Sequence, residues 1–259
     1  MQSQYLKHPT VDKTLVFIHG WACVPNDFTF QIDYFKNSYS ILLPNYSQAV
    51  SSDLPDNTNS IHWCASQINH CINQHRIQDL VLIGHRMGGG ISLALTQELT
   101  ARLSACILLD TSIPLNVDKK QVFIDLANKL RGHRATHTLE WFFDTIMFDT
   151  EYDNPTLMAH KRKEMIETCS QSFTAFASLL VDFSNFDALS ALANLQAPSM
   201  YIGARKLATD FNILNRTSKG ITTKQIFHSG HFLMLNAASE LNKQLEVFLS
   251  PLKDNSIPH

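Results

Sequence analysis

The chain of 259 residues predicts a single α/β domain built on a doubly wound, mostly parallel sheet. Short runs of aliphatic and β-branched residues alternate with segments whose apolar residues recur at helical spacing, as is typical of β-α-β units. The alternation is interrupted once, between residues 112 and 194, where the chain has helical character throughout. We therefore expect a core formed from two parts of the chain and one helical insertion.

Six segments are expected to form strands, because each is a short apolar run bounded by turn-forming or polar residues. They are Thr14–Ile18, Tyr39–Leu43, Leu80–Ile83, Ala105–Leu109, Ser199–Ile202 and Thr222–Phe227. Segments with helical periodicity lie between and after these strands. They are Asp27–Phe35, Ser60–Gln74, Gly89–Leu103 and Ala238–Leu249.

The region from 112 to 194 is too long to be a simple crossover connection. Its four helix-like segments are Val122–Leu130, Thr138–Phe148, Asn154–Ser170 and Phe173–Phe183. Since ligands of open parallel sheets bind at the carboxyl ends of the strands, a helical cap over that edge is the preferred interpretation. The prediction is a core of residues 1–111 and 195–259 and a cap of residues 112–194. The alternative is that these helices only thicken one face of the core.

Composition excludes several classes of protein. Lysine and arginine total 21 against 23 acidic residues, and a net charge of −2 without a basic block predicts no nucleic-acid partner. No apolar stretch approaches the roughly 20 residues of a membrane helix. The N-terminus lacks the apolar region of a signal peptide, and five cysteines without paired spacing predict free thiols and a cytoplasmic location. His133 and His137 lack an evident third ligand, so neither a metal nor an organic cofactor is expected.

A glycine-rich turn follows the third predicted strand. The sequence Gly84-His85-Arg86-Met87-Gly88 joins this strand to a helix, which is the layout of a nucleophile elbow. Glycines are needed at 84 and 88 because the turn is tight and a Cβ would collide with neighbouring backbone. The middle position of an elbow carries a nucleophile, whereas Arg86 stays protonated and cannot attack a carbonyl.

Three motifs in the same order and spacing resemble the α/β-hydrolase superfamily over nearly the whole chain. They are the His-Gly segment Leu15–Trp21, the elbow Gly84–Gly90 and the Gly-His-Phe segment Ser229–Leu235. The resemblance implies an α/β-hydrolase fold whose N-terminal hairpin is cut short or absent before Leu15. It implies that the backbone N–H groups of Trp21 and Met87 form an oxyanion hole and that His231 is a general base.

The resemblance leaves two candidates for the acid that would orient His231. Most members place it where this chain has Lys206, so Asp210 would need a loop shift to serve. Asp110, at the end of the fourth predicted strand, is preferred, because some members keep their acid there and a carboxylate can fix the histidine tautomer. The alternative for Asp110 is a turn or helix-capping aspartate.

A narrower resemblance supports Asp110. Cofactor-free dioxygenases that cleave N-heteroaromatic rings share this acid placement, a segment similar to Gly20-Trp21-Ala22-Cys23, and a turn similar to Pro44-Asn45-Tyr46. In that group the His-Asp pair removes a proton from the substrate. The resemblance therefore implies that His231 and Asp110 could act as a base without a serine.

The preferred interpretation is a degenerate hydrolase that binds a small, partly apolar, anionic ligand. Arg86 would pair with Asp110 or hold a carboxylate in bidentate fashion, with His19, Gly20 and His85 lining the ligand site. The alternative is an enzyme, a cofactor-free oxygenase, lyase or hydrolase acting on a small aromatic or ester substrate through the dyad of His231 and Asp110.

Two further readings stay open. Cys23 could replace the missing nucleophile, although a small buried filler is expected at that position. Arg86 could also be a recent substitution of an ordinary serine. Aromatic and apolar side chains of the predicted cap would either line the ligand site or pack between cap and sheet. They are Trp141, Phe142, Phe143, Ile146, Met147, Phe173 and Phe176. Oligomeric state is not predicted.

Overall fold

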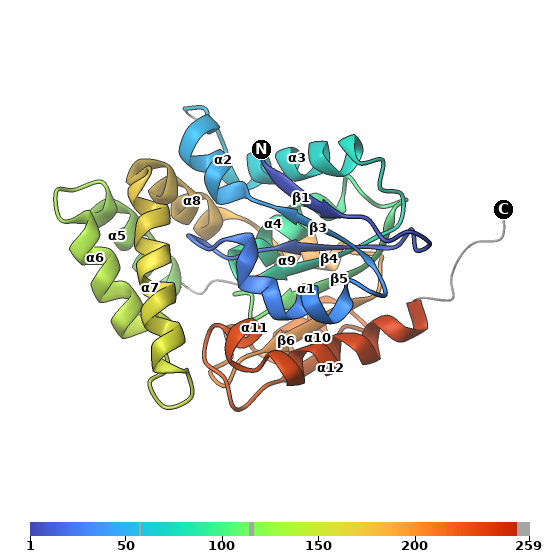
Figure 1. Cartoon of the computed structure of the whole chain (residues 1–259). Coiled ribbons are helices and arrows are strands. Elements are labelled where there is room, and N and C mark those ends of the chain that lie inside the picture. Colours follow the sequence, from blue (N-terminus) through green and yellow to red (C-terminus); the bar gives the residue numbers. More distant parts are fainter. Residues whose placement is uncertain (57, 114–116, 253–259) are drawn as a thin grey trace.

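The computed structural model describes residues 1–56, 58–113 and 117–252 (Figure 1). Within these residues a seven-stranded sheet runs in the order β1-β3-β2-β4-β5-β6-β7. Only β1 is antiparallel to its neighbour, and the other neighbouring strands are parallel. The strands are β1 (Ser3–Leu6), β2 (Thr14–Ile18), β3 (Ser40–Pro44), β4 (Leu80–His85), β5 (Leu103–Leu109), β6 (Ser199–Gly203) and β7 (Thr222–Gln225). The predicted doubly wound, mostly parallel sheet is confirmed.

Helices cover both faces of the sheet. Figure 1 shows α1 (Thr29–Phe35) and α12 (Ala238–Leu249) on one face and α3 (Ser60–Gln74) on the other, where it packs on α4 (Met87–Thr96). The remaining core helices are short: α2 (Tyr46–Asp53), α10 (Phe211–Thr217), α11 (Leu233–Asn236) and the single turn η1 (Pro25–Phe28). Strands β2, β3, β4 and β6 are buried along their whole length, as expected for strands covered on two sides.

Several details of the core differ from the prediction, including helices α2 and α10, which were not expected. The helix expected over Gly89–Leu103 ends at Thr96, because Leu103 already begins β5. Strand β1 was not among the expected strands, and it restores a four-residue antiparallel edge before Leu15. Its mixture of polar and apolar residues gives no continuous apolar run of the kind that identified the other strands.

The helical insertion lies between β5 and β6. It contains α5 (Val117–Leu130), α6 (Ala135–Phe142), the π-helical turn η2 (Phe143–Met147), α7 (Pro155–Ser170), α8 (Phe173–Asn185) and α9 (Ala188–Ala193). Figure 1 shows α5 to α8 grouped at one end of the molecule, beyond the sheet. No helix of the described chain is both long and apolar enough to span a membrane.

The insertion is joined to the core by buried polar contacts. Lys161 on α7 lies 2.5 Å from Asp27 of η1, and both side chains are almost fully buried. Asp153, just before α7, accepts a hydrogen bond from the N–H of Gly230 at 3.0 Å. A Cβ on Gly230 would lie 2.6 Å from that carboxylate, so the approach requires glycine. The insertion is thereby fixed to the loop that carries His231.

Candidate functional site

The elbow between β4 and α4 has the geometry that its glycines predict. Arg86 occupies the tip with φ 50° and ψ −114°, a conformation that side chains rarely adopt. A Cβ on Gly84 would lie 2.4 Å from the carbonyl oxygen of Gly88. A Cβ on Gly88 would lie 2.2 Å from the carbonyl oxygen of Ile18. Both glycines are therefore required by backbone that approaches from the same turn or the neighbouring strand.

Arg86 forms an ion pair with Asp110. One guanidinium nitrogen lies 2.7 Å from Oδ2 of the carboxylate, and another donates to Oγ of Ser112 at 3.5 Å. Asp110 follows β5 directly, is fully buried, and accepts at Oδ1 from the N–H of Ala204 at 3.2 Å. The Arg86 side chain is 24% exposed, so the cation reaches toward solvent from a buried carboxylate. The pairing that the sequence suggested as one possibility is present.

His231 lies beside this ion pair. Its ring packs edge-to-face on His85, with centroids 5.0 Å apart, and its backbone oxygen accepts from Nε2 of His85 at 3.0 Å. Burial, the positive charge of Arg86 and the neighbouring His85 together hold the pKa of His231 well below its usual range. The imidazole is therefore neutral at pH 7, and the dyad with Asp110 stays a prediction.

A small apolar cavity lies between the elbow and the insertion, with a volume of about 60 Å³. Core and insertion both contribute walls. They are Trp21, Arg86, Met87, Ser112 and His231 from the core and Phe123, Phe142, Met147, Leu180 and Phe183 from the insertion. Trp21 is held in place by its indole N–H, which donates to the Phe176 carbonyl oxygen at 2.9 Å. The cavity is thus an aromatic pocket with Arg86 at its floor.

A second, more polar cavity of about 60 Å³ adjoins the first. Arg86, Met147 and His231 line both cavities. The additional walls of the second are Asp110, Ile146, Phe148, Asp149, Ala204, Lys206 and Gly230. Because these three side chains line both cavities, they separate the apolar cavity from the polar cavity.

The proposed oxyanion groups border the apolar cavity. Trp21 and Met87 both line it, and within the described chain neither of their backbone N–H groups forms a hydrogen bond. The Met87 N–H belongs to the first turn of α4, where helix N–H groups lack intrahelical partners. Both N–H groups are therefore free to donate to a ligand.

Neither of the two cavities is lined by His19, Gly20 or His85, the three residues expected to bind ligand. His19 is fully buried, stacks on Tyr46 with centroids 4.2 Å apart, and donates from Nδ1 to the Gly20 carbonyl oxygen at 3.0 Å. Tyr46 donates to the same oxygen at 2.6 Å. Burial lowers the pKa of His19 and of His85 to about 3 in each case. These side chains support the loop after β2 as neutral, buried groups.

Of the remaining candidates Asp210, Lys206 and Cys23, only Lys206 lines one of the two cavities. Asp210 is an exposed N-cap of α10 and accepts from the Asn212 N–H at 2.8 Å. Lys206 is 80% exposed and pairs with Asp149 at 3.4 Å. Cys23 is buried, and burial raises the pKa of its thiol well above the usual range, which disfavours a nucleophilic thiolate. All five cysteines are unbridged and buried, as the free-thiol prediction required.

The expected aromatic residues of the insertion divide between lining and packing. Phe142 and Met147 line the apolar cavity, and Ile146 lines the polar one together with Met147. Phe143 and Phe176 are fully buried packing residues. Trp141 is half-exposed on the outer side of the insertion.

Ser112 and the Lys161–Asp27 pair were not identified from the sequence. Ser112 lines the apolar cavity. In the sequence it lies two positions after Asp110, and no motif distinguishes it from an ordinary loop serine. Lys161 and Asp27 are 134 positions apart, and no local spacing relates them. Only the docking of the insertion on the core brings Lys161 to Asp27.

Comparisons with known proteins agree with this architecture. The family model of the alpha/beta hydrolase fold matches residues 13–238. A putative esterase/lipase of Mycoplasma genitalium is 26% identical over 117 residues, which cover 44% of this chain and 42% of that protein. One of Mycoplasma pneumoniae is 30% identical over 107 residues, covering 39% and 37% respectively. The matched segments thus span about two fifths of these relatives.

Solved structures superpose over nearly the whole chain. The structure of MenH from S. aureus is 16% identical with a TM-score of 0.82, and the match covers 97% of this chain and 99% of that one. The enol-lactonase from Burkholderia xenovorans LB400 is also 16% identical, with a TM-score of 0.83 and 96% coverage of both chains. At this identity the likeness concerns the fold. Together with the family match, it establishes that the chain belongs to the α/β-hydrolase fold family.

Proposed function

We propose that this protein binds a small, partly apolar carboxylate in the pocket beneath the helical insertion and does not cleave esters by a serine mechanism. The observation that carries this proposal is Arg86 at the tip of the elbow. A guanidinium cannot form an acyl intermediate. Here it also forms an ion pair with the carboxylate of Asp110, at 2.7 Å. In this view the protein is a degenerate hydrolase, and the insertion acts as the cap of its ligand site.

The donors around Arg86 favour an anion. Asp110 compensates the charge of Arg86, but the guanidinium has five N–H groups and Nε has no hydrogen-bond partner among the described residues. The free N–H groups of Trp21 and Met87 and the N-terminal end of α4 lie at the same cavity. Backbone donors at a helix N-terminus bind carboxylates well. The proposed oxyanion hole would thus serve ligand binding.

The apolar walls restrict the rest of the ligand. Trp21, Phe142 and Phe183 surround the space above Arg86, so a flat or compact hydrocarbon portion fits better than a polar one. Each cavity holds only about 60 Å³, well below the roughly 300 Å³ at which drug-sized ligands begin to fit. For a ligand of benzoate size to bind, the Arg86 side chain would therefore have to move and open one cavity toward the other.

The alternative enzyme, with His231 and Asp110 as a base, finds less support. Asp110 is engaged by Arg86 and by the Ala204 N–H, and the positive charge of Arg86 weakens the basicity of His231. A base with a strongly lowered pKa accepts a proton poorly at neutral pH. In such a dyad His231 would share the Asp110 carboxylate with Arg86.

The test is a comparison of charged and neutral ligands of the same shape. Benzoate and phenylacetate, with benzamide and phenylacetamide as neutral matches, are titrated against the unaltered chain and against Arg86→Ala and Arg86→Gln. We expect the carboxylates to raise the melting temperature, since a ligand at 100 times its Kd stabilises by about 2.7 kcal/mol. Both variants should abolish the effect. Equal responses to acid and amide, or responses that survive Arg86→Ala, would overturn the proposal.

A further inference from the structure

A second concave site lies on the outer side of the insertion, between the end of α5 and the exposed face of α6. Its volume is about 420 Å³, which is within the range of small-molecule sites. Its walls are the C-terminal turn of α5, the connection to α6, and α6 itself. Neither Arg86 nor His231 lines it, so it is separate from the pocket described above.

The ionisable side chains lining this outer site are all basic. Lys129, His133, Arg134 and His137 line it, and no lining residue is acidic. The whole chain carries a net charge of −2, so this concentration of basic groups departs from the average surface. Within the described chain, Lys129 and Arg134 form no ion pair. Their positive charges are available to an anion that enters the concavity.

Two carboxylates beside the outer site are engaged by α7. Glu140 lies 3.6 Å from Arg162 on α7, and its other oxygen lies 3.8 Å from Nδ1 of His137. Arg162 also pairs with Asp144 at 2.8 Å. His137 is therefore partly compensated by Glu140, whereas Lys129 and Arg134 have no ion-pair partner within the described chain.

The N-terminal end of α6 and the ring of Trp141 both border the outer site. Arg134 is its N-cap and makes no side-chain capping bond, so the first-turn N–H groups of this eight-residue helix remain without a side-chain acceptor. Arg134, His137 and Trp141 follow one another at spacings of three and four, which places them on one face. The positive end of the helix adds to the surrounding side-chain charges.

Trp141 supplies an apolar wall. Its side chain is 49% exposed, and Nζ of Lys129 lies 5.8 Å from the indole centroid. A half-exposed tryptophan beside several cations provides a surface on which a planar ring can stack while its anionic group meets the positive charges. A carboxylate alone would use few of these donors, whereas a phosphate monoester has three acceptor oxygens and a charge of roughly −1.5 to −2.

From these observations we propose that the outer site binds a small phosphate monoester carried by a planar ring, of the nucleoside monophosphate class. The phosphate lies among Lys129, His133 and Arg134 at the N-terminal end of α6. The ring lies against Trp141. The proposal is independent of the ligand proposed for the pocket at Arg86.

The experiment is a calorimetric titration of the intact chain with AMP, adenosine and inorganic phosphate at low and high salt. We expect AMP to bind more tightly than either of its parts, and to bind less tightly at 1 M salt, where the screening length falls to about 3 Å. Lys129→Ala and Arg134→Ala should each weaken AMP binding by about tenfold, the effect of losing one charge-assisted hydrogen bond. Trp141→Leu should weaken AMP binding and leave phosphate binding unchanged.

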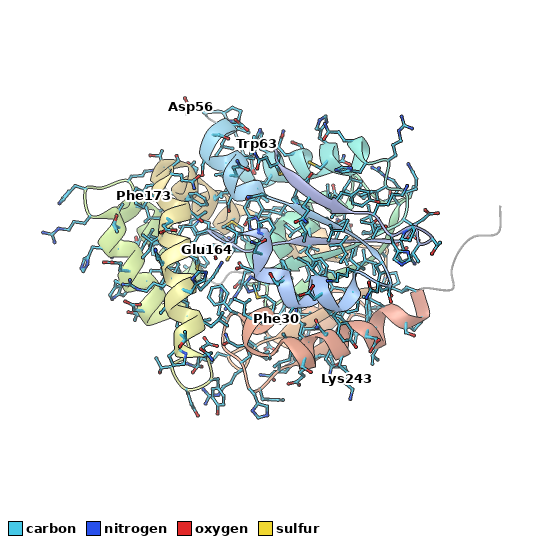
Figure 2. The ribbon with its side chains drawn as sticks, in the orientation of Figure 1. Phe30, Asp56, Trp63, Glu164, Phe173 and Lys243 are labelled. Atoms are coloured by element: carbon cyan, nitrogen blue, oxygen red, sulfur yellow. The ribbon has the colours of Figure 1, made fainter. Side chains whose placement is uncertain are left out.

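Lys243→Ala is the matched control, because Lys243 is an exposed lysine on α12, which Figures 1 and 2 show on the other side of the molecule from α6. It should leave AMP binding unchanged. Absence of AMP binding at low salt, or AMP binding that persists in the Lys129→Ala/Arg134→Ala double variant, would refute the site. Loss of AMP binding in Arg86→Ala would assign the anion to the inner pocket. Binding to phosphatidylserine-containing vesicles without AMP binding would assign the surface to a membrane and also refute the proposal.

Discussion

The guanidinium of Arg86 and the carboxylate of Asp110 meet at 2.7 Å across the ends of two neighbouring strands. Asp110 is fully buried, and a buried carboxylate is costly unless a charge or several donors compensate it. Arg86 supplies that charge from the position where an elbow normally carries its nucleophile. Arg86 therefore stabilises the buried carboxylate of Asp110 from the tip of the elbow.

Replacing Arg86 with serine should restore ester cleavage. Arg86→Ser places a hydroxyl at the elbow tip and frees Asp110 to orient His231. Loss of one member of a catalytic triad costs up to about 10⁶-fold in kcat, so a restored triad should exceed the unaltered chain by at least about 10³-fold. The measurement is hydrolysis of p-nitrophenyl acetate.

Three control variants test whether the activity gained by Arg86→Ser depends on the new hydroxyl and on His231. Arg86→Ala removes the cation without adding a nucleophile and should stay inactive. Arg86→Ser/His231→Ala should lose the gained activity, whereas Arg86→Ser/Ser112→Ala should keep it, because Ser112 is expected only to line the cavity. A folded Arg86→Ser variant without activity would count against the pairing of His231 with Asp110.

Acid should destabilise the protein through its buried histidines. Burial is the largest cause that lowers the pKa of His19 and His85 to about 3, and it also lowers that of His231. The unfolded chain binds protons at these groups below pH of about 6.5, while the folded chain does not. As far as these histidines are concerned, the free energy of unfolding is therefore highest above that pH. It decreases progressively as pH falls toward 3.

The size of the acid effect follows from the number of protons. Each histidine contributes a slope of up to about 1.4 kcal/mol per pH unit in the free energy of unfolding. Urea unfolding between pH 7 and 5 measures the slope of the unfolding free energy against pH. His19→Gln should lower that slope by the share of one histidine. A free energy of unfolding that does not change over this range would show that the three histidines titrate alike in the folded and unfolded states.

Removing one partner of the buried Lys161–Asp27 pair should strongly destabilise the protein. Lys161→Met leaves Asp27 buried without its cation, and breaking a buried pair in this way costs about 3–5 kcal/mol. Lys161→Met combined with Asp27→Asn should recover part of the loss, since the unpaired charge is gone. The measurement is the urea unfolding free energy of the single and double variants. Additive effects of the two substitutions would contradict direct coupling.

The parts of the site that local motifs determine could be predicted from the sequence. The elbow is specified by Gly84 and Gly88, whose Cβ positions are blocked by backbone, and Asp110 by its place at a strand end. The Gly-His-Phe segment likewise located His231, which the structure places at the same cavities as Arg86.

The rest depended on contacts between distant parts of the chain. Asp153 reaches Gly230 across 77 positions, and Lys161 reaches Asp27 across 134. These contacts exist because the insertion docks on the core, and no spacing within either segment indicates them. The misplaced end of α4 has a different cause: Leu99 and Leu103 continue the apolar pattern of the helix, although Leu103 belongs to β5.

The positive φ of Arg86 carries an energetic cost. A non-glycine residue in such a conformation costs about 1–3 kcal/mol. Glycine at this position would relieve the strain, but it would leave the buried carboxylate of Asp110 without its cation. The strained turn and the buried ion pair therefore depend on each other, and substitutions at position 86 should change both at once.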